Sequence, residues 1–283
     1  MKNRLMRLMT VEEMQIYLRE KDTIILPYAL CEQHGYHLPL DTDIRNAEFA
    51  AKVLAEKLDC IIAPTLNYSF SGGMLPGTIN VSPNTFSTLV GEIVESLALQ
   101  GFKNIIILPG HDGSESLLHL KESLRALKWL KPALRDVMIL LVPMFDFSPA
   151  LKELFENNDY HAAWAETSSI LYWSPEVVRE KIVLDEEKVA ARLREDPDSY
   201  QLRETLSTLP QEIPATSQRS DVKVGVMGYP EKATRELGKK IEQEFAENAS
   251  RAIGEAIAVA EENRKTGKRF RQDNGGKLKI FTI

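Results

Sequence analysis

Short apolar runs alternate with longer amphipathic segments along the first half of the chain, and this alternation restricts the fold more than any other feature. The runs are rich in β-branched residues, which is typical of buried strands. They occupy 23–26, 60–63, 105–108 and 137–142, and helical patterns follow over about 44–58, 84–100 and from 114 onwards. Strands that alternate with helices indicate βαβ units. We therefore predict an α/β fold with three layers, α/β/α, around a mostly parallel central sheet.

The rest of the chain is organised less regularly. A capping box at Thr10–Glu13 predicts a helix through about Arg19. The charged, proline-containing segment 184–222 is interpreted as an insertion or excursion from one domain covering 1–283. A long helix is expected over about 231–262, followed by a C-terminal tail, 264–283, that is basic at its start and ends in a predicted edge strand, 277–283.

Composition excludes several classes of protein. The 283 residues carry a net charge of −6 and no basic stripe, so we expect no nucleic-acid partner. Two cysteines, Cys31 and Cys60, are too few for a disulfide framework. The N-terminus lacks the apolar core of a signal peptide, and no run has the length of a transmembrane helix. We expect a cytoplasmic protein without a membrane partner.

The segment from Glu32 to Asp43 is the densest collection of chemically active side chains. It contains one glutamate, two histidines and two aspartates within a loop that follows the first strand. Mixed imidazole and carboxylate ligands suit Zn²⁺ or Mn²⁺, and Fe²⁺ is also possible. A polar loop of this kind is usually only a loop, so the segment by itself leaves a metal site and a set of turn-capping residues equally open.

A second imidazole, His111, favours the metal site. It lies in the turn Gly110–Gly113 directly after the third strand. In open parallel sheets, ligands bind beyond the carboxyl ends of the strands. The loop with Glu32 and His34 and the turn with His111 both follow such an end. His119, on a helical pattern among leucines, is interpreted as structural.

Five segments in order resemble the creatininase (creatinine amidohydrolase) family. The first is Glu32-Gln-His-Gly35 with His37-Leu-Pro39 and Asp43. The others are Pro76-Gly-Thr-Ile79, Gly101-Phe102 leading to Gly110-His111, the helix with His161-Ala162, Glu166-Thr-Ser168 and Pro175–Val178, and Gly225–Gly228 with Pro230 and Ala233-Thr234. The match runs from about residue 20 to 250. The resemblance implies a creatininase-like fold.

The resemblance also implies two divalent metal ions per chain. The family's first-motif ligands correspond to Glu32, His34 and Asp43, with Asp43 bridging both ions, and its Gly-His histidine corresponds to His111. Creatininase itself completes the second ion's shell with a glutamate where this chain has Gly113, so Glu166 becomes the candidate fifth ligand and catalytic residue, against the alternative of a solvated helical glutamate.

Three further residues have expected roles. His161 corresponds to a histidine that transfers protons beside the metals in the family. Asp159 is a candidate active-site carboxylate, with a purely structural role left equally open. His37 is expected to orient a metal ligand. Ala29, Tyr36 and the segment 109–114 depart from the family pattern where a substrate would meet the loops, which argues against creatinine itself as the substrate.

These observations predict a metal-dependent hydrolase. Metal binding lowers the pKa of water, so attack of metal-bound hydroxide on a carbonyl of a small, cyclic substrate is expected, with amide C–N hydrolysis favoured. One alternative is a hydrolase of a cyclic polyol ketone or lactone, and another is a non-catalytic metal-binding scaffold. A nucleotide-binding regulator is disfavoured because no Gly-rich phosphate loop follows a strand. The resemblance implies a homo-oligomer, a hexamer in the family.

Overall fold

The computed structural model describes residues 4–272 and 278–282, and it confirms the predicted α/β fold. The strands are β1 Thr23–Tyr28, β2 Ile61–Ile62, β3 Asn104–Pro109, β4 Met138–Leu141, β5 Gln201–Glu204, β6 Ala215–Gln218, β7 Lys268–Gln272 and β8 Leu278–Thr282. The helices are α1 Val11–Glu20, α2 Thr42–Leu58, α3 Pro83–Gln100, α4 Ser114–Leu130, α5 Pro149–Glu156, α6 Trp164–Trp173, α7 Glu187–Glu195 and α8 Arg235–Thr266.

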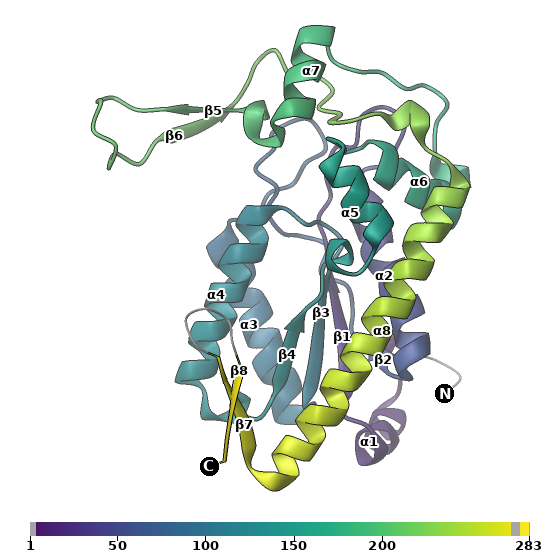
Figure 1. The fold of residues 1–283 in the computed structure, drawn as a ribbon, viewed down its shortest axis with the longest axis vertical. Helices are drawn as coiled ribbons and strands as arrows, with labels where there is room; N and C mark the ends of the chain where they lie inside the picture. Colours follow the sequence, from purple (N-terminus) through teal and green to yellow (C-terminus); the bar gives the residue numbers. More distant parts are fainter. Residues whose placement is uncertain (1–3, 273–277, 283) are drawn as a thin grey trace.

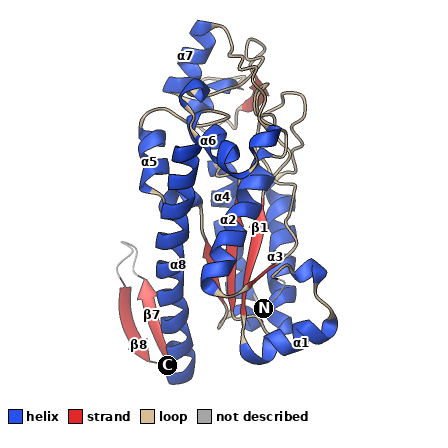
Figure 2. Cartoon of the chain, turned by 90° about the vertical axis from the view of Figure 1, so that its right-hand side faces the viewer, coloured by secondary structure: helices blue, strands red, loops and turns tan. Residues whose placement is uncertain are grey.

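The central sheet has four parallel strands in the order β2-β1-β3-β4. Its strands are almost entirely apolar because helices cover both faces, as expected for a parallel sheet. Alternate side chains enter different cores: Ile105 and Ile107 face α3 and α4, whereas Ile106 and Leu108 face α2 and α8. Figure 2 shows the sheet between α3 on one side and α8 on the other.

The helices begin where side chains satisfy their first backbone amides. Thr10 and Glu13 form the predicted capping box of α1, and Ser82 and Thr234 accept hydrogen bonds from the first turns of α3 and α8. A left-handed Gly101 ends α3 and directs the chain into β3. Regular local signals therefore produce the βα units that bring the carboxyl ends of β1 and β3 side by side.

The segment 184–222 leaves the body of the molecule and returns to it. It contains α7 and the antiparallel pair β5–β6, which projects away from the sheet as a hairpin (Figure 1). The base of this excursion is bonded to the body, because the Tyr200 hydroxyl donates to the Ser71 carbonyl at 3.0 Å and Gln218 accepts from the Met74 amide at 2.8 Å. The excursion therefore contributes a wall beyond the carboxyl ends of the strands.

The C-terminal segment corrects one prediction. Residues 278–282 form β8, which pairs with β7 in a separate antiparallel hairpin and not with an edge of the central sheet. Residues 277 and 283 of the predicted strand lie outside the described part. The basic residues before it include Arg264 in the last turn of α8. Its guanidinium donates a hydrogen bond to Oδ1 of Asn104 at the start of β3. Among the described residues, no helix combines the length and apolarity that crossing a bilayer requires.

Candidate metal centre and its cavity

The predicted ligands come from separate elements that meet beyond the carboxyl ends of β1 and β3. Glu32 and His34 lie in the loop after β1, and His111 follows β3. Asp43 is the second residue of α2, and Glu166 is the third of α6. All five predicted ligands therefore converge, although 134 positions separate the first from the last in the numbering, 32 to 166.

One group consists of Glu32, Asp43 and His111. The Nδ1 atom of His111 lies 3.2 Å from Oε2 of Glu32 and 3.4 Å from Oδ2 of Asp43. One ligand atom from each residue lies within 4.8 Å of the other two, close enough to hold one metal ion. The set of two carboxylates and one imidazole suits Zn²⁺ or Mn²⁺.

A second group shares Asp43 and adds His34 and Glu166. The Nε2 atom of His34 lies 3.2 Å from Oδ1 of Asp43 and 3.6 Å from Oε2 of Glu166. The other ring nitrogen, Nδ1, donates to the Glu32 carbonyl at 3.1 Å. In the neutral ring, Nε2 then carries a lone pair directed at the carboxylates, which is the orientation of a metal-ligating histidine. Asp43 thus presents one oxygen to each group.

Unpaired atoms test whether these residues fit a metal. Both carboxylate oxygens of Asp43, Oε2 of Glu32, Nε2 of His34 and Nε2 of His111 are buried without a hydrogen-bond partner in the described part of the chain. Buried polar atoms are rarely left unpaired unless an ion or water satisfies them. Since most of these atoms face one another across the two groups, the residues fit divalent cations.

The pKa shifts of these residues also indicate that the site favours a positive charge. Burial lowers the pKa of His34, but the adjacent Asp43 and Glu166 outweigh it and raise that pKa well above its ordinary value. Burial likewise lowers the pKa of His111, and Glu32 and Asp43 reverse the shift. In turn, the imidazoles hold the pKa of Asp43 below its usual range despite its burial. A cation among these carboxylates is therefore favoured.

Two glycines allow this convergence. A Cβ atom on Gly110 would lie 2.1 Å from the Asp43 carbonyl oxygen, so only glycine lets the end of β3 approach the start of α2. A Cβ atom on Gly113 would lie 2.3 Å from Nε2 of His111. The predicted absence of a ligand at position 113 therefore has a steric reason: the His111 ring occupies the space that a side chain would need.

His161 lies beside the second group, immediately before α6. Its ring is 4.4 Å from that of His34 between centroids, and its Nε2 lies 2.8 Å from the Gln33 carbonyl oxygen and 3.0 Å from Nε2 of Gln33. Donation from Nε2 to the carbonyl leaves Nδ1 as the proton acceptor. Together with Glu32 and His34, His161 also forms a third group that could hold an ion.

Asp159 and His37 occupy supporting positions. The carboxylate oxygens of Asp159 accept from the amides of Trp164 and Ala165 at 2.8 Å each, so Asp159 caps α6, the helix that carries Glu166. Burial raises the pKa of Asp159 to about 6. Nε2 of His37 lies 3.0 Å from the hydroxyl of Thr167, the residue after Glu166, and His37 is not a member of the candidate metal groups found among the described residues.

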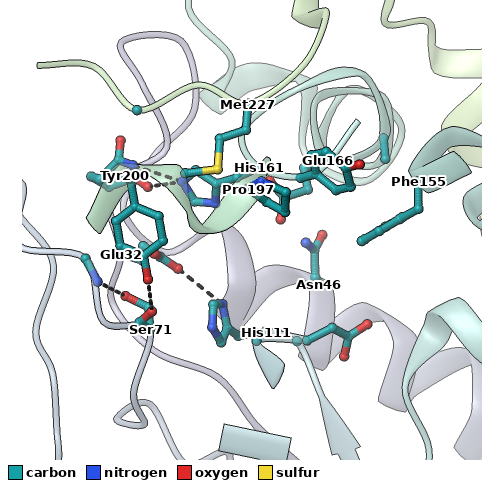
Figure 3. A pocket seen from close by; sticks show the side chains of 18 of the residues that line it. Glu32, Asn46, Ser71, His111, Phe155, His161, Glu166, Pro197, Tyr200 and Met227 are labelled. Carbon is teal, nitrogen blue, oxygen red and sulfur yellow. Dashed lines mark hydrogen bonds and ion pairs between the residues drawn. The ribbon is translucent and has the colours of Figure 1, made fainter. Parts of the chain in front are cut away.

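A cavity of about 280 Å³ opens beside the candidate ligands. Its walls include residues that the sequence did not single out: Asn46 of α2, Leu151 and Phe155 of α5, Tyr200 of the excursion and Ile241 of α8. Figure 3 shows Glu32, His111, His161 and Glu166 around this space, with Asn46 and Phe155 on one side of it. The spacing of Asn46, three positions after Asp43 on the same helix face, is the one sequence signal that could have indicated it.

A sequence model of the creatininase family, described as creatinine amidohydrolase, matches residues 7–253. The creatinine amidohydrolase of Pseudomonas putida is 26% identical over 57% of this chain and 68% of its own length. A mycofactocin precursor peptide peptidase of Mycobacterium tuberculosis is 30% identical over 56% of this chain and 61% of its length, and the 3-dehydro-scyllo-inosose hydrolase of Thermotoga maritima is 27% identical over 63% and 59%. The last two matches thus span less than two thirds of those relatives.

Solved structures agree in fold. A manganese creatininase superposes with a TM-score of 0.69 at 20% identity, covering 90% of this chain and 98% of that one. A mutant creatininase of Zn–Zn type gives 0.69 at 22% identity, with 90% and 99% coverage. At such low identities these structures show a similar fold only. Membership of the family is shown by the sequence model that matches residues 7–253. The chain belongs to the creatininase family of hydrolases.

Proposed function

We propose that the protein is a divalent-metal-dependent hydrolase that cleaves an amide C–N bond in a small, uncharged substrate, with cyclic amides the first candidates. The observation that carries the proposal is the position of Asp43, whose two oxygens face His34 and His111 at 3.2 and 3.4 Å beside a cavity of about 280 Å³. The peptidase and the inosose hydrolase among the relatives leave a peptide or a cyclic polyol ketone as alternative substrates.

The ligand sets are assigned from the two groups. Glu32, Asp43 and His111 would hold one ion, and His34, Asp43 and Glu166 would hold the other, with Zn²⁺ or Mn²⁺ as the preferred metals. Divalent ions bound there supply an activated water and polarise the substrate carbonyl. Asp159 keeps the start of α6 in place, and with it Glu166, so we assign it a positioning role in place of direct chemistry.

His161 is assigned to proton transfer. Its Nε2 hydrogen is engaged with the Gln33 carbonyl, so Nδ1 is available to take a proton and return it to the leaving nitrogen. The ring lines the cavity next to His34. A non-catalytic scaffold would not need this arrangement, and Glu166, which lies 3.6 Å from His34, completes the second group.

The first experiment measures metal content. The purified protein, and the variant Asp43→Ala, would be analysed for zinc, manganese and iron after incubation with Zn²⁺ or Mn²⁺ and removal of excess ion. We expect up to two ions per chain in the wild type and a loss in Asp43→Ala, because that carboxylate serves both groups. Asp41→Ala is the matched control, since Asp41 is half-buried and pairs with Arg45 outside the groups.

Activity is tested on the loaded protein with small cyclic amides, formamides, lactones and cyclic ketones. We expect hydrolysis among the amides and its loss in Asp43→Ala and His161→Ala, the latter without loss of metal. A wild-type protein that takes up neither Zn²⁺ nor Mn²⁺ would refute the proposal. The family's homo-oligomeric state, a hexamer, remains a prediction that light scattering of the same samples can check.

A further inference from the structure

Asn46 is a buried polar residue that the proposed chemistry does not use. It lies on α2 three residues after Asp43, and only 8% of its surface is exposed. Its side chain lines the cavity, and Figure 3 shows the amide in the space between His111 and Phe155. No described residue donates a hydrogen bond to its Oδ1 atom. A buried acceptor without a donor is unfavourable, so Asn46 requires an explanation.

Another buried asparagine shows what a structural role looks like in this protein. The Nδ2 atom of Asn104, at the start of β3, donates to Asp22 at 2.8 Å and to Thr23 at 3.1 Å. Its Oδ1 atom accepts from Arg264 at 2.9 Å. Both ends of the Asn104 amide are therefore satisfied within the fold. Oδ1 of Asn46, in contrast, has no donor among the described residues, and the Asn46 residue lines a cavity large enough for a ligand.

The wall around Asn46 is mainly apolar. Leu151 and Phe155 come from α5, Ala165 and Ser169 from α6, and Ile241 from α8. No lysine or arginine is among the described residues that line the cavity, whereas Asp198 and Glu115 at other parts of its lining are acidic. No cationic side chain among them is therefore in place to bind an anionic group of a substrate, and the apolar side chains beside Asn46 offer no hydrogen bonds to hydroxyl groups at that end of the cavity.

We propose that Asn46 determines substrate specificity by accepting a hydrogen bond from an N–H group of the substrate. The hydrocarbon part of the same substrate would then lie against Leu151, Phe155 and Ile241. The substrate class is a compact, uncharged amide or cyclic ureide with a free N–H and an apolar substituent, in preference to carboxylates and polyols. This inference rests on the proposed hydrolase function, because it names the substrate class of the same site.

The first test needs no ligand. Thermal unfolding is measured with a chelator present for the wild type, Asn46→Leu and the matched control Asn104→Leu. Removing an unpaired buried acceptor costs the fold nothing, so Asn46→Leu should unfold at the wild-type temperature or above it. Asn104→Leu should unfold at a lower temperature, because it leaves the partners of that amide unsatisfied. A comparable decrease in Asn46→Leu would assign Asn46 to the fold and overturn the proposal.

The second test compares ligands with and without the N–H group. Calorimetry measures the binding of 5-phenylhydantoin, its 1,3-dimethyl derivative and the carboxylate hydantoin-5-acetic acid to the metal-loaded wild type and Asn46→Leu. The wild type should bind 5-phenylhydantoin about tenfold or more tightly than either of the others. In Asn46→Leu the ratio between the first two ligands should approach one. A purely steric effect of the methyl groups would persist in this variant.

Metal content measured on the same samples separates the two proposals. A wild type without metal uptake would refute the hydrolase function, whatever its ligand preference. A metal-loaded wild type that binds the methylated and unmethylated ligands equally, that prefers the carboxylate or that binds none of the three overturns the role of Asn46 alone. Unchanged metal content in Asn46→Leu, with loss of the N–H preference, is the expected result.

Discussion

The Nε2 atom of His34 lies 3.2 Å from Oδ1 of Asp43, and neither atom has a hydrogen-bond partner among the described residues. The His34 ring donates its other nitrogen hydrogen to the Glu32 carbonyl, so Nε2 is the nitrogen that faces the carboxylate. Two acceptors in buried contact repel each other unless a proton or a metal ion lies between them. Without metal, a proton on Nε2 fills this place, because Asp43 and Glu166 raise the pKa of His34 well above its ordinary value; a bound metal ion would take the place of that proton.

Removal of metal should consequently lower stability. A ligand that binds only the folded state, at a free concentration of 100 times its Kd, adds about 2.7 kcal/mol. For a chain of this size, that corresponds to a rise in Tm of roughly 5–10 °C. Thermal unfolding with a chelator, and again with Zn²⁺ or Mn²⁺, measures the difference. Asp43→Asn should abolish it, and a Tm that is unaffected by either ion would contradict the assignment.

Gly110→Ala should disrupt the site from outside the ligand set. The added Cβ atom would meet the Asp43 carbonyl oxygen at 2.1 Å and Ala47 at 2.9 Å, so α2 must move away from β3. We expect a loss of at least about 1–3 kcal/mol in the free energy of unfolding, measured in urea, together with reduced metal content.

The matched control for this change is Gly254→Ala in α8. A Cβ atom there meets no atom within 4 Å, so alanine should stabilise the helix by about 0.5–1 kcal/mol and leave metal content unchanged. If both alanine variants behaved alike, the close approach of β3 and α2 would not be what positions Asp43.

His37 should make the protein sensitive to acid. Burial, with the positive charge of His34 added, lowers the pKa of His37 to about 4, below its ordinary value of 6.5. The folded state thus binds fewer protons than the unfolded state, and the contribution of neutral His37 is present above pH 6.5 and lost as pH falls towards 4. His37→Gln should reduce this loss by roughly 2–3 kcal/mol.

Urea unfolding from pH 7 to 4, with a chelator in all samples, measures the difference between the two proteins. His119→Gln is the matched control, because it makes the same substitution at an exposed histidine of α4. If the free energy of unfolding fell equally between pH 6.5 and 4 in the wild type and His37→Gln, the fold would not hold His37 neutral.

Local patterns in the sequence were sufficient for much of the fold. Apolar runs such as 105–108 can only be buried on both faces, and the cap at Thr10 and the glycine at position 101 mark helix ends. The prediction that 277–283 forms an edge strand of the central sheet was wrong. A strand pattern specifies a pleated surface but not its partner, and here β7 lies nearest along the chain.

The sequence by itself determined the α/β class and indicated candidate ligands in the loops after two strands, because periodicity and residue chemistry are local properties. Only the tertiary structure brought Glu166 to His34, turned Asp159 towards the amides of α6 and left Oδ1 of Asn46, a residue of the cavity lining, without a donor. These relationships depend on how α2, α5, α6 and α8 pack against one another. Such packing joins residues far apart in the chain, and no local pattern records it.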